Sequence, residues 1–246
     1  MLTPILDFAL VHADLERTRT CGDVKRAIGR ALRVHSCVVD LHEADQCRLA
    51  MQQKLDAQAE AGRDDVTEAA LLATAVQLYA RATSTSLKND GDRKSFRIED
   101  ALKRKPEQLS DHKLLLVLRS RVFAHVYENE EVAGQAWNRA SVFFFLHEGL
   151  WRIGSATNRV KFDWEPLDRL GRQLPVAMEI LMNRAEIAQE RLARSIEQSK
   201  DDASLQQALA SARVDPRDFF GSEEQARASI SASLANPSAL TSFKPG

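Results

Sequence analysis

Residues 23 to 61 contain no proline and a single glycine, Gly29. Within this stretch apolar side chains and one histidine recur at roughly helical spacing, at Ile28, Leu32, His35, Val39, Leu41 and Leu49. The pattern predicts one long helix that ends at Gly62. The whole chain of 246 residues has only 10 Gly and 7 Pro. These are too few turn residues for the many short strands of an all-β sandwich or barrel. We therefore expect a mainly α-helical fold.

Similar patterns predict helices elsewhere in the chain. Thr3-Pro4 is a typical helix start and predicts a short helix to about residue 17. Further helices are expected from residue 64 or 65 to about 82, over 111–127 after Ser110, and from near Pro166 to about 198. Residues 201–246 are rich in Ala and Ser, and predict one weak helix and then a flexible, mobile tail. We divide the chain into a helical domain, 1–200, and this terminal segment, 201–246.

Residues 141–162 interrupt the helical pattern. Short apolar runs alternate here with turn residues such as Gly149 and Gly154, which predicts a small β hairpin or meander inserted into the helical domain. A helix over 142–151 remains an alternative, because periodicity does not settle short apolar runs. Two roles are open for Phe143-Phe144-Phe145 and Trp151: packing in a strand core, or stacking on RNA bases.

Charge and cysteine content narrow the class of protein. The chain has 34 Lys and Arg against 35 Asp and Glu, so neither a general positive charge for nucleic acid nor an acidic excess is present. Three cysteines without a CxxC pair argue against a disulfide framework and a Cys-rich zinc site. The N-terminal sequence is a poor signal peptide, and no run approaches the roughly 20 apolar residues of a membrane helix. We expect a cytoplasmic protein without a membrane partner.

Several standard sites are missing from the sequence. His35 and His42 could share a helix face, but no acidic or cysteine partners stand at ligand spacing, and Gln46 rules out an HExxH motif. There is no Gly-rich phosphate loop and no GxSxG elbow. We therefore expect no metal and no cofactor. The stretch 81–105 carries eight Lys/Arg and four Asp/Glu, a local net of +4, and is either a solvated loop or a rim that contacts phosphates.

The most informative segment is Leu-Arg-Ser-Arg-Val-Phe-Ala-His, residues 118–125. At about 100° per residue, an apolar arc forms from Leu115, Leu118, Val122 and Val126. Arg119 falls inside this arc and His125 lies at its edge. A charge on a core-facing stripe is costly unless it is paired or meets an anion. The bland alternative is an arginine that extends to solvent beside a core histidine.

Arginine and histidine together can cleave RNA without a metal. A histidine can take the proton from a ribose 2′-hydroxyl near neutral pH. A guanidinium can hold the charge that develops on the phosphorane. Arg119 and His125 are therefore candidate catalytic residues.

The spacing of Arg119 and His125 resembles the R-x(4–6)-H signature of the HEPN superfamily (higher eukaryotes and prokaryotes nucleotide-binding). The segment is especially similar to HEPN toxins of abortive-infection and toxin–antitoxin systems. The resemblance implies a HEPN-type helical bundle and a metal-independent endoribonuclease. It also implies a homodimer whose two motifs form one cleft, and an antitoxin partner such as a nucleotidyltransferase. Ser120 stands where active members often have Asn or Asp, and we expect it to assist the catalytic pair.

Three further residues are candidates for contact with RNA. Arg121 follows the motif arginine on the same helix, and Tyr79 and Arg81 lead into the basic stretch. An Arg at a helix C-terminus also simply complements the helix dipole, which is the structural alternative for Arg81. The competing hypothesis for the whole chain is a non-catalytic helical module with an interaction or regulatory role. In that case Arg119 should pair with Asp or Glu inside the fold.

Overall fold

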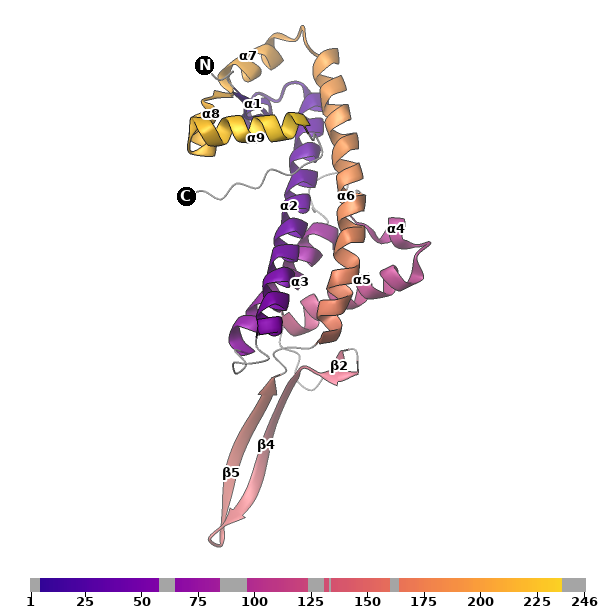
Figure 1. Cartoon of the computed structure of the whole chain (residues 1–246), viewed down its shortest axis with the longest axis vertical. Helices are drawn as coiled ribbons and strands as arrows, with labels where there is room; N and C mark the ends of the chain where they lie inside the picture. Colours follow the sequence, from indigo (N-terminus) through magenta and orange to yellow (C-terminus); the bar gives the residue numbers. More distant parts are fainter. Residues whose placement is uncertain are drawn as a thin grey trace. The chain divides into compact units, whose positions relative to one another are not determined.

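The computed structural model describes residues 5–57, 65–84, 97–123, 131–132, 134–159 and 164–235. The structure is mainly helical, with short antiparallel strand pairs (Figure 1). This confirms the expectation of a mainly α fold with a small β hairpin. Two compact units are present, residues 1–39 with 181–246 and residues 40–180. The two longest helices, α2 (Gly22–Ala57) and α6 (Trp164–Gln198), contribute residues to both units.

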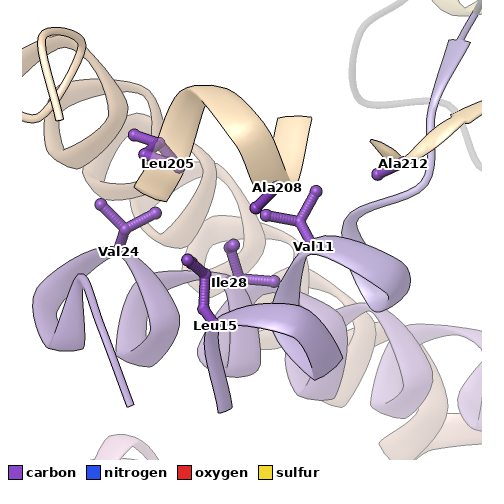
Figure 2. Packing of buried hydrophobic residues seen from close by; sticks show 7 residues of the cluster. All are labelled: Val11, Leu15, Val24, Ile28, Leu205, Ala208 and Ala212. Atoms are coloured by element: carbon purple, nitrogen blue, oxygen red, sulfur yellow. The ribbon is translucent and has the colours of Figure 1, made fainter. Parts of the chain in front are cut away.

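The first unit joins the two ends of the chain. Besides parts of α2 and α6 it contains β1 (Ile5–Leu6), α1 (Phe8–Thr18), α7 (Ala203–Ser211), β6 (Arg213–Val214), α8 (Pro216–Phe220) and α9 (Glu223–Ala235). Strands β1 and β6 pair antiparallel, with Ile5 opposite Val214. The core of this unit lies between α1, α2 and α7 (Figure 2) and consists of Val11, Leu15, Val24, Ile28, Leu205, Ala208 and Ala212.

Both ends of the chain differ from the sequence-based expectation. Helix α1 begins at Phe8 with Asp7 as its N-cap, because Ile5 and Leu6 are held in a strand by β6. Thr3-Pro4 lies outside the described residues. Residues 203–235 form three helices where one weak helix was expected, and α7 packs in the core against α1. The structure thus groups the C-terminal helices with the N-terminal segment, in place of the expected division at residue 200. Residues 236–246, which include much of the expected tail, lie outside the described residues.

The second unit contains the expected motif. Its elements, besides parts of α2 and α6, are α3 (Asp65–Ser84), α4 (Glu99–Leu102), α5 (Pro106–Leu118), the π-helical turn η1 (Arg119–Phe123), β2 (Glu131–Val132), β3 (Gln135–Ala136), β4 (Asn138–His147) and β5 (Leu150–Arg159). Helix α5 starts at Pro106, which is favoured in the first turn, so Ser110 lies inside the helix instead of capping it. Residues 85–96 of the basic stretch lie outside the described residues.

Strands β4 and β5 form the expected hairpin, and the helical alternative over 142–151 is wrong. Ten residues of each strand pair antiparallel around the two-residue turn Glu148-Gly149. Both turn residues have positive φ, 51° and 76°, as two-residue hairpin turns of this hand require. Glycine at the second position adopts this conformation without strain. The hairpin therefore starts three residues earlier than predicted, at Asn138.

Candidate functional site

The expected catalytic motif begins at the point where α5 changes its winding. Leu115 and Leu118, the last apolar residues of α5, are buried as the apolar arc predicted. The chain then continues directly into the π-helical turn η1, which starts at Arg119. Single π turns are rare in proteins and are frequent at functional sites. The arginine of the motif therefore occupies the first position of an unusual local structure.

Arg119 is exposed, so its expected place on a core-facing stripe is wrong. No residue of η1 is buried, whereas α5 buries Asp111, His112, Leu115 and Leu118. The expected apolar arc assumed about 100° per residue, the rotation of an α-helix. A π turn has more residues per turn, so the side chains after Leu118 no longer follow that spacing. Among the described residues, no carboxylate forms an ion pair with Arg119. Its guanidinium is in contact with solvent.

The other motif residues lie in or just after the same turn. Ser120 is half-buried, and its hydroxyl donates a hydrogen bond of 3.1 Å to the Val117 carbonyl oxygen. Arg121 is exposed. Phe123 ends the turn with its ring edge-on to buried Trp137, with centroids 6.1 Å apart. His125 lies outside the described residues, which end at Phe123 and resume at Glu131. The indole N–H of Trp137 donates to the Val132 carbonyl, 3.2 Å away, and so joins this ring to the β2–β3 strand pair.

Tyr79 lies inside the fold, away from solvent. Its side chain is fully buried, and its hydroxyl is 2.8 Å from Nδ1 of His112, which is also fully buried. Thr83, one turn further along α3, donates its hydroxyl to the Tyr79 carbonyl at 2.7 Å. In this position Tyr79 is not open to a substrate. The expected contact of Tyr79 with RNA is thus replaced by an internal contact between α3 and α5.

Burial shifts the pKa values of this pair in opposite directions. It raises the pKa of Tyr79, because the phenolate is the charged form and loses its water. It lowers the pKa of His112, because the imidazolium is the charged form; the nearby Glu99 carboxylate acts against this shift. Nε2 of His112 is buried without a hydrogen-bond partner, and Glu99 Oε1 is 3.8 Å away. Both side chains are thus neutral and structural at neutral pH.

Arg81 binds a carboxylate of the protein itself. Its Nε lies 2.6 Å from Oδ2 of Asp40 and its Nη2 lies 2.5 Å from Oδ1, a bidentate pair. The Asp40 side chain is almost buried, whereas most of Arg81 is exposed. The arginine therefore satisfies an internal charge with one edge, while its side chain stays largely exposed. It also lies in the last turn of α3, as expected for an arginine that complements the helix dipole, and its expected contact with RNA stays a prediction.

A second internal carboxylate has the same arrangement. Asp111, at the start of the buried face of α5, accepts hydrogen bonds from Arg169 at 2.6 Å and from Arg172 at 3.1 Å, both on α6. Glu165 also binds Arg169 and is the largest contribution to the raised pKa of this arginine. These pairs hold α5 and α6 together within the second unit. Their cations are committed to internal carboxylates, in contrast to Arg119.

The internal polar network was not predicted from the sequence. A weak signal existed, because Asp40 stands between Val39 and Leu41 in a helix whose neighbours are apolar, and Asp111-His112 opens the buried face of α5. A carboxylate in such a place needs a cationic partner. The partners themselves are 41 residues away for Arg81 and 58 for Arg169, so no local pattern connects them.

No family model, no curated protein and no solved structure matches the chain. Within the described ranges, no helix combines the length and the hydropathy that crossing a membrane requires. The same part of the chain holds no group of three or more His, Cys, Asp or Glu side chains arranged to share a metal ion. The features that bear on function are thus the motif segment, its π turn and the polar network beneath it.

Proposed function

We propose that the protein is a metal-independent endoribonuclease of the HEPN type, acting in the cytoplasm as a toxin or an antiphage defence effector. One observation carries the proposal. Arg119 stands at the first position of a π turn, exposed, and pairs with no carboxylate among the described residues. The competing module hypothesis required Arg119 to be paired inside the fold. A solvent-facing guanidinium on a rigid helix is suited to bind a phosphate.

The proposed reaction uses two side chains of the motif. His125 takes the proton of a ribose 2′-hydroxyl, and the 2′ oxygen attacks the adjacent phosphorus. Arg119 stabilises the negative charge that develops on the phosphorane. The bond from phosphorus to the 5′ oxygen breaks and this oxygen takes up a proton, which leaves a 2′,3′-cyclic phosphate and a 5′-hydroxyl end. Ser120 supports the turn through its bond to Val117, which keeps Arg119 at the start of η1.

The proposal names three partners. RNA is the substrate, with Arg121 as an exposed contact for its backbone. A second copy of the chain brings a second Arg119–His125 pair to the same cleft. An antitoxin such as a nucleotidyltransferase holds the activity in check. All three follow from the resemblance of residues 118–125 to HEPN toxins.

A non-catalytic interaction module is the second candidate function. The observation in its favour is the β4–β5 hairpin, whose apolar side chains are largely exposed. A binding module would need this surface and would not need Arg119. The two hypotheses therefore predict opposite results for substitution of the motif arginine.

Single-turnover cleavage of one RNA by purified variants tests the proposal. Arg119→Ala and His125→Ala should each slow cleavage by about 100-fold or more, the usual scale for loss of a charge stabiliser or a general acid–base group. Arg121→Ala is the matched control, because it removes the same charge from the same turn. It should slow cleavage by less than about 10-fold, since a phosphate contact contributes mainly to affinity.

The pattern of the three variants decides between the hypotheses. An inactive Arg121→Ala with a nearly unchanged Arg119→Ala would show that the motif is assigned to the wrong arginine. Equal activity of all three variants would place any cleavage outside this segment. Thermal unfolding of each variant keeps the comparison among folded proteins, and the exposed positions Arg119 and Arg121 should change the free energy of unfolding by no more than about 0.5 kcal/mol.

A further inference from the structure

Strands β4 and β5 form a long two-stranded ribbon (Figure 1), and its two faces carry different side chains. Side chains alternate between the faces along each strand, and directly paired residues share a face. The pairs Phe143–Gly154, Phe145–Arg152 and His147–Leu150 therefore belong to one face. The pairs Val142–Ser155, Phe144–Ile153 and Leu146–Trp151 belong to the other face, which we call the open face.

On the first face, side chains of the hairpin itself cover part of the apolar surface. The ring of Phe143 lies over Gly154, where an added Cβ would be only 2.6 Å from Phe143 Cε2. The rings of Phe143 and Phe145 are neighbours on the same strand, with centroids 6.0 Å apart. As a result the two phenylalanines are 43–44% exposed, less than the apolar residues of the open face.

The three pairs of the open face are uncharged, and five of their six side chains are apolar and exposed. Its five apolar side chains are 61–73% exposed. Together they present roughly 600 Å² of apolar surface, beyond the few hundred Å² that soluble monomers usually leave uncovered. An isolated two-stranded hairpin is only marginally stable in water, so a partner on this face would also stabilise the hairpin.

Side-chain size changes along the open face in a way that suits a second copy of the same surface. The large pair Leu146–Trp151 lies next to the turn, Phe144–Ile153 is in the middle, and the small pair Val142–Ser155 is farthest from the turn. A two-fold axis across the middle pair, perpendicular to the strands, places Trp151 over Ser155 of the second copy and Leu146 over its Val142. Leu146 and Trp151 near the turn then meet smaller residues of the second copy, as close packing favours, while the middle pair meets its own copy on the axis.

We propose that the open face is a homodimer interface, in which the hairpins of two chains pack face to face and antiparallel. The alternative two-fold axis, parallel to the strands, would place the large pairs on each other and leave the small pairs apart. Two open faces would together bury roughly 1,200 Å², the lower bound of a specific protein–protein interface. No charged residue lies among these three pairs, so the two-fold axis brings no like charges together within them.

A lipid surface fits the hairpin less well than a second chain. Among the described strands, β4 and β5 pair only with each other, so the outer edge of each keeps unpaired backbone groups. Such groups cost several kcal/mol each in hydrocarbon. Arg152, opposite Phe145, also lies on the first face. Face-to-face packing covers the open face alone and leaves both edges and Arg152 in water.

Two leucines beside the turn give a matched test of the interface. Leu146 on the open face is 61% exposed and Leu150 on the first face is 60% exposed. Sedimentation equilibrium of the full chain should show a concentration-dependent dimer. Leu146→Lys should raise the dimer dissociation constant by about 100-fold or more, because each interface would then bury two unpaired charges. Leu150→Lys should change it by less than about 3-fold.

An exchange of sizes tests the direction of packing. Trp151→Ser removes the largest side chain, and Ser155→Trp places a second large one opposite it, so each single variant should weaken the dimer by about 10-fold or more. The double variant restores one large and one small residue at every contact and should recover to within about 10-fold of the wild-type constant. A parallel arrangement predicts no such recovery.

Three results would overturn the proposal. The first is a monomer at every concentration, and the second is an equal effect of Leu146→Lys and Leu150→Lys on the dimer. The third is a monomer that binds phosphatidylcholine–phosphatidylglycerol vesicles and loses this binding on Leu146→Lys, which would assign the face to lipid. None of these measurements involves RNA cleavage. A monomer at every concentration would also contradict the shared cleft of the proposed nuclease, whereas the two leucine variants test the hairpin interface alone.

Discussion

Arg81 and Asp40 show at the scale of single residues how this fold handles an internal charge. The Asp40 carboxylate is nearly buried and accepts two hydrogen bonds from one guanidinium. A buried carboxylate that loses its partner keeps the cost of its lost hydration. The pair is therefore expected to matter for stability, whether or not Arg81 also meets RNA.

Arg81→Met should lower the free energy of unfolding by about 1–3 kcal/mol, because it leaves Asp40 without its bidentate partner. Arg26→Met is the matched control. Arg26 also pairs with an aspartate, Asp23, but both side chains are mostly exposed, so the loss should stay within about 0.5 kcal/mol. Urea denaturation of both variants measures the difference. Equal effects would mean that Arg81 does not stabilise Asp40.

Protonation of His112 makes the stability of the second unit depend on pH. Its pKa is lowered from 6.5 by burial, so the unfolded chain binds the proton at a higher pH than the folded chain does. His112 therefore makes its full contribution to the free energy of unfolding above pH 6.5, and this contribution decreases as the pH falls below that value. The hydrogen bond between Tyr79 Oη and Nδ1 of His112, 2.8 Å long, joins the same imidazole to α3.

Denaturation curves from about pH 8 to about pH 5 measure this dependence. The His112→Gln variant should lose less stability over the range than the wild type does, since the titrating group is gone. His35→Gln replaces an exposed histidine and should keep the wild-type slope. Parallel curves for wild type and His112→Gln would contradict the assignment of the pH dependence to His112.

At the scale of elements, the sequence predicted the long helices and the hairpin and missed what depends on distant partners. Helices α2, α3 and α6 were predictable because apolar spacing and the lack of proline are local signals. The hairpin was predictable from Gly149 and the apolar runs around it. The strand at Ile5–Leu6 was not, because it exists through pairing with residues 213–214. The π turn at Arg119 was not predicted, because the expected apolar arc assumed α-helical geometry along the whole segment.

The C-terminal helices were underestimated for a different physical reason. The buried residues here include Ala208, Ala212 and Ala226. Each alanine contributes little apolar area, so a prediction based on large apolar side chains does not detect them. Small side chains let helices approach closely and still form a core. Only Leu205 brings a large buried group from α7 to this core.

Leu205→Ala should therefore lower the free energy of unfolding by about 2–5 kcal/mol, the range for a fully buried leucine. Leu10→Ala is the control, because Leu10 lies on α1 with 47% of its side chain exposed, and it should cost less than about 1 kcal/mol. Thermal or urea unfolding reports both. A loss at Leu205 no larger than at Leu10 would show that α7 does not pack against α1 and α2 in solution.

At the scale of the whole molecule, the chain has a near-neutral charge and two surfaces with a proposed role, the motif segment and the open face of the hairpin. The net charge is −1, so the proposed binding of RNA would rest on local cations such as Arg119 and Arg121. The open face of the hairpin offers an apolar contact without charges. A homodimer formed through the hairpin involves the open face. The proposed catalysis depends on the motif segment, residues 118–125.

Cleavage of RNA by the purified wild-type chain in excess chelator tests the central claim most directly. The account predicts that cleavage continues, that the products end in a 2′,3′-cyclic phosphate, and that RNA with a 2′-deoxy sugar at the scissile position resists. Arg119→Ala in the same assay excludes a contaminating nuclease. Cleavage that stops in chelator and returns with a divalent ion, or that proceeds on the deoxy substrate, would contradict the mechanism.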